Sequence, residues 1–350
     1  MGEAFSLLRR IRGFHRLEHV TRRSWQKWNV KRNTRHLHGA RQLQLDASDV
    51  VLVCLVKDGE LYIRSFLDHY RRIGVKHIVF MDNGSTDGTI EIASQYDWVS
   101  IVQCTLPARY YELPLRLYAL EKFAKGHWCL CVDVDEIFDY PYSRQIPLSA
   151  LLTYLSGHGY TAVVGQMLDM FAPGPLNSVP CSPTDWLLDV YRYYDVSDIE
   201  KVDYFGQDVA ALYAHNTLSN SDIKVYYGGI RKKLFGTRNG LTKHCLFRIV
   251  DGLRPMVHPH YLDHGRIADF TVVLYHFKFA GDFYAICNRH VEEKTWGHDE
   301  YELYLEKQAD EELTPMGPAA RELLQPEQLL EDRFLVAGEG FRKWAESYMV

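Results

Sequence analysis

The residues best suited to chemistry in this chain are Asp133, Asp135 and Glu136, three carboxylates that follow the apolar run 128–132. An apolar run of that length is typical of a strand that is buried on both faces. Because unpaired carboxylates are costly to bury, the cluster implies a bound cation or a solvated cleft. Asp-x-Asp followed by Glu suits a hard divalent ion that bridges a diphosphate. The plainer interpretation is a strand that ends in an acidic loop.

A second polar turn lies upstream, at residues 82–89, with the sequence Asp-Asn-Gly-Ser-Thr-Asp-Gly-Thr. Glycine and Asx residues favour a tight turn, and Ser85 or Asp87 is suited to cap a following helix. Local turn and cap chemistry would by itself account for Asp82, Asn83 and Asp87.

These two polar segments follow strands of one predicted sheet. Apolar runs predict strands at residues 50–56, 78–81, 99–104 and 128–132. Helical patterns lie between them, near 61–74, 89–96 and 112–125. Alternation of strands and helices predicts an α/β fold with a mostly parallel sheet and right-handed crossovers. Such sheets bind ligands at the carboxyl ends of their strands, so both polar segments are expected at one ligand-binding edge.

The order and spacing of the motifs resemble glycosyltransferase family 2 proteins of GT-A fold, in particular a bacterial branch. The match covers about residues 48–305. It is carried by residues 56–60 (VKDGE), 69–75 (HYRRIGV), 81–89 (MDNGSTDGT), 128–136 (WCLCVDVDE), 165–171 (GQMLDMF), 228–236 (GGIRKKLFG) and 274–279 (LYHFKF). Gly59 departs from the pattern, since the family usually carries Asn-Glu directly after the lysine.

The resemblance implies a GT-A, Rossmann-like domain at 48–305, with a nucleotide-binding half at 48–140 and an acceptor half at 141–280. A basic segment at 1–47 would precede it, and helices at 306–350, near 319–331 and 335–347, would follow it. Helical additions are therefore expected at both ends of a mostly parallel α/β sheet.

The same resemblance implies an inverting, metal-dependent transfer of a sugar from a nucleoside diphosphate-sugar to a glycan, lipid or protein acceptor. The donor nucleotide would be contacted by Lys57, Asp82, Asn83, Asp87, Arg116, Asp133 and Lys278. Mn²⁺ or Mg²⁺ would be bound by Asp133, Asp135 and His276, with Asp135 in direct contact. Glu136 would brace the two aspartates. A solvated helix face explains Arg116 equally well, and a structural histidine explains His276.

The catalytic base is predicted from the acceptor half. An inverting transfer needs a carboxylate within one hydrogen bond of the acceptor hydroxyl. Asp169 follows the apolar residues 160–167 and is the first choice, with Asp203 and Asp208 as alternatives. A turn or helix cap is the plainer interpretation of Asp169. The aromatic residues between 174 and 272 are candidates for the acceptor site, although ordinary aromatic packing is the commoner case.

Composition narrows the function classes. The chain has 350 residues, 47% of them hydrophobic, which supports a substantial core, and a net charge of −5, which disfavours general binding to nucleic acid. Seven cysteines without a Cys-x-x-Cys pair predict reduced core thiols in a reducing compartment. No run of 18 apolar residues and no signal peptide is evident, so a cytoplasmic location is expected.

The N-terminal segment is strongly basic. Residues 1–41 carry eleven arginines and lysines against Glu3 and Glu18, and aromatic residues are interleaved with them. This pattern fits an interfacial helix in peripheral contact with the inner face of an anionic membrane. It also fits a surface helix that packs on its own domain, or a disordered arm.

Two alternatives to the transferase stay open. A nucleotidyltransferase on a similar fold would release pyrophosphate; its Gly-Gly-x-Arg-like loop would stand near the N-terminus, whereas Gly228-Gly229-Ile230-Arg231 comes late in the chain. A non-catalytic member of the family would bind nucleotide or glycan without turnover.

Overall fold

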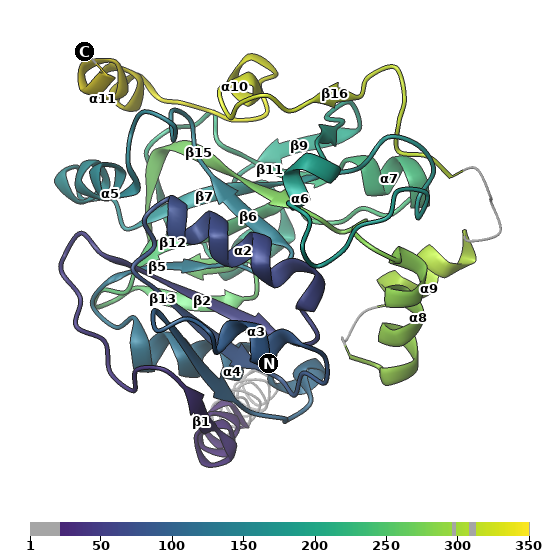
Figure 1. The fold of residues 1–350 in the computed structure, drawn as a ribbon. Helices are drawn as coiled ribbons and strands as arrows, with labels where there is room; N and C mark the ends of the chain where they lie inside the picture. Colours follow the sequence, from purple (N-terminus) through teal and green to yellow (C-terminus); the bar gives the residue numbers. More distant parts are fainter. Residues whose placement is uncertain (1–21, 296–298, 308–312, 350) are drawn as a thin grey trace, which may run out of the picture.

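The computed structural model describes residues 22–295, 299–307 and 313–349, and a large sheet with helices on both faces runs through its centre (Figure 1). The sheet contains β1 (Arg35–His38), β2 (Val50–Val56), β3 (His77–Asp82), β4 (Val99–Gln103), β5 (Trp128–Cys131), β6 (Glu136–Asp139), β7 (Ala162–Asp169), β10 (Thr217–Leu218), β12 (Thr242–Arg248) and β15 (Arg266–His276). Their order is β1-β4-β3-β2-β5-β12-β7-β15-β10, and β6 pairs with β15.

The strand directions confirm the predicted mostly parallel α/β sheet. Neighbouring pairs among β2, β3, β4 and β5 are parallel, and so are the pairs of β15 with β7 and with β10. Antiparallel β12 joins the two groups, since it pairs with both β5 and β7. Seven strands, namely β2, β3, β4, β5, β7, β10 and β15, therefore run one way, and β1, β6 and β12 run the other.

The first four strands of the α/β core create a topological switch point. The chain runs outward from β2 through α2 (Glu60–Arg72), β3 and α3 (Thr89–Ala93) to β4. It then returns through α4 (Ala108–Phe123) and adds β5 on the other side of β2. In such a sheet the crevice between the two oppositely wound halves is the usual place for a ligand. Here the switch point lies at the carboxyl ends of β2 and β5.

Alternating side chains of β2 pack into two separate hydrophobic cores, one on each face of the sheet. Leu52 and Cys54 point to the face covered by α2, where they join a cluster with Phe66. Val51 and Val53 point to the face covered by α4. All seven residues of β2 are buried, which is why the strand lacks a polar alternation and reads as a continuous apolar run.

The remaining elements surround this core. The helices are α5 (Leu148–Gly157), α6 (Leu187–Val190), α7 (Ile230–Phe235), α8 (Phe283–Glu293), α9 (Glu300–Glu306), α10 (Gln328–Glu331) and α11 (Glu339–Met349), with a short 3₁₀ helix η1 (Asp208–Leu212). Three two-stranded sheets pair β8 (Tyr193–Tyr194) with β16 (Arg321–Glu322), β9 (Ile199–Asp203) with β11 (Lys224–Gly228), and β13 (Arg254–His258) with β14 (Tyr261–Asp263).

The C-terminal segment is less helical than its sequence predicts. Instead of a helix near 319–331, residues Arg321–Glu322 form β16 and pair with β8, and α10 covers only four residues. Pro326 follows closely after β16 and is poorly suited to a helix interior. The second predicted helix is present as α11, where the ring of Phe341 stacks on that of Phe270 at 4.0 Å. The segment thus covers one edge of the main sheet.

Part of the basic N-terminal segment belongs to the main fold. Residues 22–33 form a helix, and β1 pairs antiparallel with β4 at the edge of the sheet. Residues 1–21, which carry part of the basic pattern, lie outside the described residues. Among the helices that the structure describes, none combines the length and apolarity needed to cross a bilayer.

Candidate functional site

The Asp133 cluster lies at the switch point of the sheet, immediately after β5. Its loop is held at this edge because the Phe277 N–H, just beyond β15, donates to the Asp135 carbonyl oxygen (2.9 Å). Strands β7 and β15 end at the same edge, where Asp169 and His276 are register partners. The structure therefore brings together Asp133, Asp135, Asp169 and His276, which are separated by up to 143 positions in sequence.

Two buried cations hold Asp133. Arg116 of α4 donates from Nη2 to one carboxylate oxygen (2.6 Å), and Lys243 of β12 donates from Nζ to the other (2.9 Å). Burial alone would raise the pKa of Asp133, but the charges of Arg116 and Lys243 outweigh it and hold the pKa well below its usual value. The side chain keeps 32% of its surface exposed, so this carboxylate stays ionised at the mouth of the site.

Lys243 is the member of this cluster that sequence reasoning missed. Its side chain is 1% exposed and also bridges to Glu136, whose oxygens lie 2.8 and 3.1 Å from Nζ. Glu136, which was predicted to brace the aspartates and to be catalytic, accepts from the Asp133 N–H (2.9 Å). Residues 242–248 (TKHCLFR) are not an apolar run, so the sequence offered no local signal that this lysine lies in a buried strand.

A chain of contacts runs from Asp135 into the protein interior. Asp135 Oδ2 lies 3.3 Å from His276 Nε2, and the Nδ1–H on the other side of the ring donates to Asp169 (2.5 Å). The second oxygen of Asp169 accepts from Arg231 Nε (2.8 Å). Burial would lower the pKa of His276, but Asp135 and Asp169 outweigh it and raise the pKa to about 9 in the absence of a cation.

The position of Asp169 does not suit the direct catalytic base predicted from the sequence. Its side chain is 2% exposed, and both carboxylate oxygens are occupied by His276 and Arg231. Burial would raise the pKa of Asp169, but the Arg231 and His276 charges lower it. A carboxylate so placed orients the histidine and is shielded from an acceptor hydroxyl. The alternative Asp203 lies on β9, away from the main sheet, where it pairs with Lys224.

The Asp82 turn is built by its own side chains. Asp82 has no exposed surface and accepts from the N–H groups of Gly84 (2.9 Å) and Ser85 (3.1 Å) and from Gln103 Nε2 (2.7 Å). Asn83 donates to two backbone carbonyl oxygens after β4. These contacts favour the turn-forming role of both residues, so any contact with a nucleoside falls to the surface that they shape.

Asp87 joins the loops that follow β2 and β3. It accepts from the Glu60 N–H (2.9 Å) at the start of α2, while the Glu60 carboxylate accepts from the Gly88 N–H (3.0 Å). A third bond runs from the Gly59 N–H to Thr89 Oγ1 (2.7 Å). The two loops therefore form one rigid wall beside the Asp133 cluster, with Asp87 inside it.

Gly59, the departure from the family pattern, lies where a side chain would crowd this wall. A Cβ atom there would come within 2.9 Å of Val56 Cγ2 and 3.1 Å of Val134 Cγ2. The close approach lets the loop after β2 pack directly on the loop after β5. Glycine at this position thus follows from the packing at the switch point.

Helices α8 and α9 lie over the same edge. Lys57, after β2, pairs with Glu293 at the end of α8, and Lys278, after β15, donates to the Tyr301 hydroxyl of α9 (3.0 Å). Burial would lower the pKa of Lys278, but Tyr301 and the nearby Glu300 outweigh it and raise it. Both lysines, predicted to contact the donor nucleotide, are engaged with these helices in the structure.

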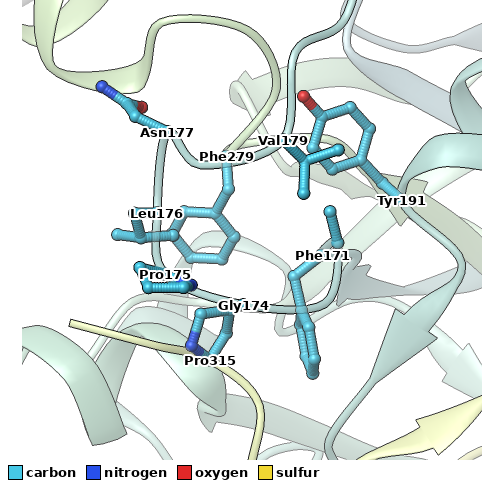
Figure 2. A pocket seen from close by; sticks show the side chains of 10 residues that line it. Phe171, Gly174, Pro175, Leu176, Asn177, Val179, Tyr191, Phe279 and Pro315 are labelled. Atoms are coloured by element: carbon cyan, nitrogen blue, oxygen red, sulfur yellow. The ribbon is translucent and has the colours of Figure 1, made fainter. Parts of the chain in front are cut away.

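The aromatic residues between 174 and 272 are mostly packed in the interior. Tyr191, Tyr194 and Tyr226 are at most 3% exposed, which matches ordinary packing. Beyond Asp169, a pocket opens between the loop 171–179 and Phe279, with Tyr191 at its side (Figure 2). Its free volume of about 10 Å³ has room for roughly one water molecule, so it is too small for a sugar ring.

A separate group of titratable side chains, outside the Asp133 cluster, is formed by His215, Asp263 and His264. Asp263 is 3% exposed, and one of its oxygens faces His215 Nδ1 (3.0 Å), His264 Nδ1 (3.1 Å) and Arg254 (3.5 Å). An arginine on the same oxygen makes the group a hydrogen-bonded ion cluster at the surface.

The chain is similar in part to known glycosyltransferases. No family model matches it. A stretch of 127 residues is 30% identical to the lipopolysaccharide core biosynthesis glycosyltransferase LpsC of Rhizobium meliloti (strain 1021); it covers 31% of this chain and 44% of that protein. The chain therefore spans less than half the length of this curated relative.

Solved structures show weaker similarities. TarS 1–349 of S. aureus is 14% identical over 73% of this chain and 68% of that chain, with a TM-score of 0.34. Glucosyl-3-phosphoglycerate synthase of Mycobacterium tuberculosis, solved with Mn²⁺, UDP-glucose and phosphoglyceric acid, is 21% identical over 35% of this chain and 44% of that chain, with a TM-score of 0.26. The mannosyltransferase PcManGT of Pyrobaculum calidifontis, solved with GDP-Man and Mn²⁺, is 19% identical over 42% and 43%, also with a TM-score of 0.26.

Proposed function

We propose that the chain is an inverting, metal-dependent glycosyltransferase of GT-A type that moves a sugar from a nucleoside diphosphate-sugar to a glycan, lipid or protein acceptor. The observation that carries the proposal is the pair formed by Asp135 and His276, 3.3 Å apart at the switch point of the sheet. The partial identity to LpsC supports the same class of reaction.

The residues present fit a divalent cation. Two ligand atoms about 2.1 Å from one ion, at right angles, are roughly 3 Å apart, close to the distance between Asp135 Oδ2 and His276 Nε2. Asp169 holds the other ring nitrogen of His276, which is the usual arrangement behind a metal-binding histidine. A mixed oxygen and nitrogen set suits Mn²⁺ better than Mg²⁺, which prefers oxygen alone.

Asp133 has a different role from Asp135 in this proposal. Both of its oxygens are already held by Arg116 and Lys243, yet the side chain remains partly exposed. It is therefore placed to accept hydrogen bonds from ribose hydroxyls or from water on the cation, while the two cations keep it ionised. The wall formed by residues 57–60 and 82–89 borders the nucleoside.

The bound ion would supply a Lewis acid for the departing diphosphate. The chain's own residues would orient the diphosphate. Asp135 would do so from the loop after β5, His276 from the end of β15, and Lys278 from the segment that follows β15. Asp169 acts through His276 as a positioning residue, so the acceptor hydroxyl would have to meet another carboxylate or the substrate itself.

The seven free cysteines, six of them buried, fit a reducing compartment. The proposal therefore places the protein on the cytoplasmic side of the membrane.

The test is product analysis with a panel of UDP-, GDP-, CDP-, ADP- and dTDP-sugars in the presence of Mn²⁺. The expected result is release of one nucleoside diphosphate by the wild type and none by Asp135→Asn. Asp203→Asn, the same change at an exposed carboxylate, should behave as wild type. Pyrophosphate release from a nucleoside triphosphate and a sugar phosphate would instead identify a nucleotidyltransferase. Nucleotide binding that survives Asp135→Asn, without turnover of any donor, would identify a non-catalytic protein.

A further inference from the structure

Among the described residues, the helix of residues 22–33 packs one side on the rest of the protein (Figure 1). Val30 is fully buried, and Asn29 Nδ2 donates to the Tyr111 hydroxyl (2.9 Å) on α4. Gln26 adds a bond to the backbone carbonyl oxygen of Tyr110 (2.8 Å). These contacts fix the rotation of the helix and therefore decide which residues face outward.

Aromatic residues lie on the exposed flank of this helix, and the Trp25 ring also approaches Tyr111 of α4, with ring centroids 6.3 Å apart. Trp25 and Trp28 are 55% and 53% exposed, and Arg32 lies 5.3 Å over the Trp28 ring. Residues 25, 28 and 32 follow the i, i+3, i+7 spacing that places side chains in one stripe. Tyr110 at the start of α4 extends the surface with a ring that is 54% exposed and lies beneath Arg109. Isolated exposed aromatic residues are common, but a stripe of this kind marks an interaction surface.

The surroundings of the stripe carry charge of one sign. Residues 22–41 contain seven basic residues, namely Arg22, Arg23, Lys27, Lys31, Arg32, Arg35 and Arg41, and no Asp or Glu, in a chain whose net charge is −5. Among the described residues, the helix forms one ion pair with a carboxylate, between Lys27 and Glu121 of α4 (2.6 Å). The surface is therefore complementary to an anionic partner.

A groove lies between this helix and α4. It has a volume of about 270 Å³ and is lined by Lys27, Trp28, Lys31, Pro114, Tyr118 and Glu121. Trp28 and Tyr118 supply aromatic surface and Lys31 supplies a positive charge, whereas Lys27 is paired with Glu121. This lining suits a small anionic group joined to an apolar body, which is the chemistry of an acidic phospholipid.

We propose that the Trp28 face, defined as Trp25, Trp28, Lys31, Arg32 and Tyr110, docks on an anionic lipid surface. Tryptophan and tyrosine rings settle at the level of the headgroups, and lysine and arginine extend to the lipid phosphates. The helix thus lies in the plane of the interface and does not span it. Arg116 comes six residue steps after Tyr110 on α4, about 9 Å along the helix axis, so docking brings the Asp133 cluster close to the lipid.

The test is co-sedimentation of the full chain with vesicles of phosphatidylcholine that contain 30% phosphatidylglycerol, compared with phosphatidylcholine alone. Binding should be selective for the anionic vesicles and should weaken between about 0.05 and 0.5 M salt, because the Debye length shortens. Each basic residue near the surface contributes about fivefold in partition, so Lys31→Glu with Arg32→Glu should lower binding at least about 25-fold. Trp25→Ser with Trp28→Ser should also lower it about tenfold.

Matched controls come from α11, which also carries adjacent basic residues and an exposed aromatic ring, Tyr348. Arg342→Glu with Lys343→Glu, and Tyr348→Ser, should leave vesicle binding unchanged. The proposal is overturned if the wild-type protein does not co-sediment with the anionic vesicles. It is also overturned if the α11 variants lose as much vesicle binding as the Trp28-face variants. Tighter binding to single-stranded nucleic acid than to the vesicles would also overturn it. Far-UV circular dichroism and thermal midpoints confirm that the compared variants are folded.

Discussion

His276 Nδ1 donates to the Asp169 carboxylate at 2.5 Å, and the two residues are register partners at the ends of β15 and β7. The bond decides which ring nitrogen remains for Asp135 on the opposite side. Because neighbouring parallel strands end together here, the sheet itself sets the orientation of the imidazole. The relationship makes Asp169 a positioning residue for a cation site.

Replacement of Asp169 by Asn should weaken Mn²⁺ binding by about 10- to 100-fold, the usual effect of losing the partner behind a ligating histidine. Isothermal titration of the protein with Mn²⁺ measures this directly. Asp203→Asn serves as the control. If Asp169 were instead the direct base, its replacement would abolish turnover and leave Mn²⁺ affinity at the wild-type value.

Lys243→Met should strongly destabilise the protein. The substitution keeps the length of the side chain but leaves Asp133 and the buried Glu136 without their shared cation. Breaking a buried ion pair by removing one partner costs about 3–5 kcal/mol. Urea unfolding measures the loss in the free energy of unfolding. The control, Lys224→Met, removes the partner of the exposed Asp203, which should cost no more than about 1 kcal/mol. Equal losses for the two variants would show that the Lys243 cluster adds little.

Stability should fall on mild acidification because of buried histidines. Burial lowers the pKa of His69 to about 4, although the hydrogen bond to the Phe138 carbonyl oxygen acts in the opposite direction. Burial also lowers the pKa of His244, to about 3. The unfolded chain takes up protons near pH 6.5, whereas the folded chain does not do so until about pH 4. Stability is therefore lost as the pH falls through this window, by about 1.4 kcal/mol per pH unit for each histidine.

Urea unfolding at pH 7 and pH 5 checks this dependence for wild type and His69→Gln. The variant should lose less stability than wild type between the two values, whatever its stability at pH 7. His215→Gln, at an exposed position, should retain the wild-type difference. An unchanged pH dependence in His69→Gln would contradict the assignment.

The strands and turns of residues 50–131 could be predicted because their signals are local. Buried parallel strands such as 50–56 are continuous apolar runs, and the Asx- and glycine-rich residues 82–89 mark their own turn. The sequence predicts a strand at 160–167, with Asp169 after its end. In the structure β7 continues for two more residues, and Asp169 is its last residue.

The remainder depends on contacts between distant residues. Lys243 meets Asp133 because antiparallel β12 inserts between β5 and β7, and nothing in residues 242–248 alone specifies that place. Arg231 similarly reaches Asp169 from α7, across 62 positions in sequence. The basic N-terminal segment shows the same limit, since β1 joins the sheet edge beside β4.

We propose a metal-dependent nucleotide site that is built on Asp135. The most direct measurement is thermal unfolding with UDP, GDP, CDP, ADP and dTDP, each with Mn²⁺ and with EDTA, for wild type and Asp135→Asn. A nucleotide at 100 times its Kd stabilises by about 2.7 kcal/mol, enough to raise the unfolding midpoint by several degrees. We expect the unfolding midpoint to rise with one nucleotide class in the presence of Mn²⁺. The rise should be lost with EDTA, and it should also be lost in Asp135→Asn. No rise with any nucleotide, or an equal rise in the variant, would contradict this proposal.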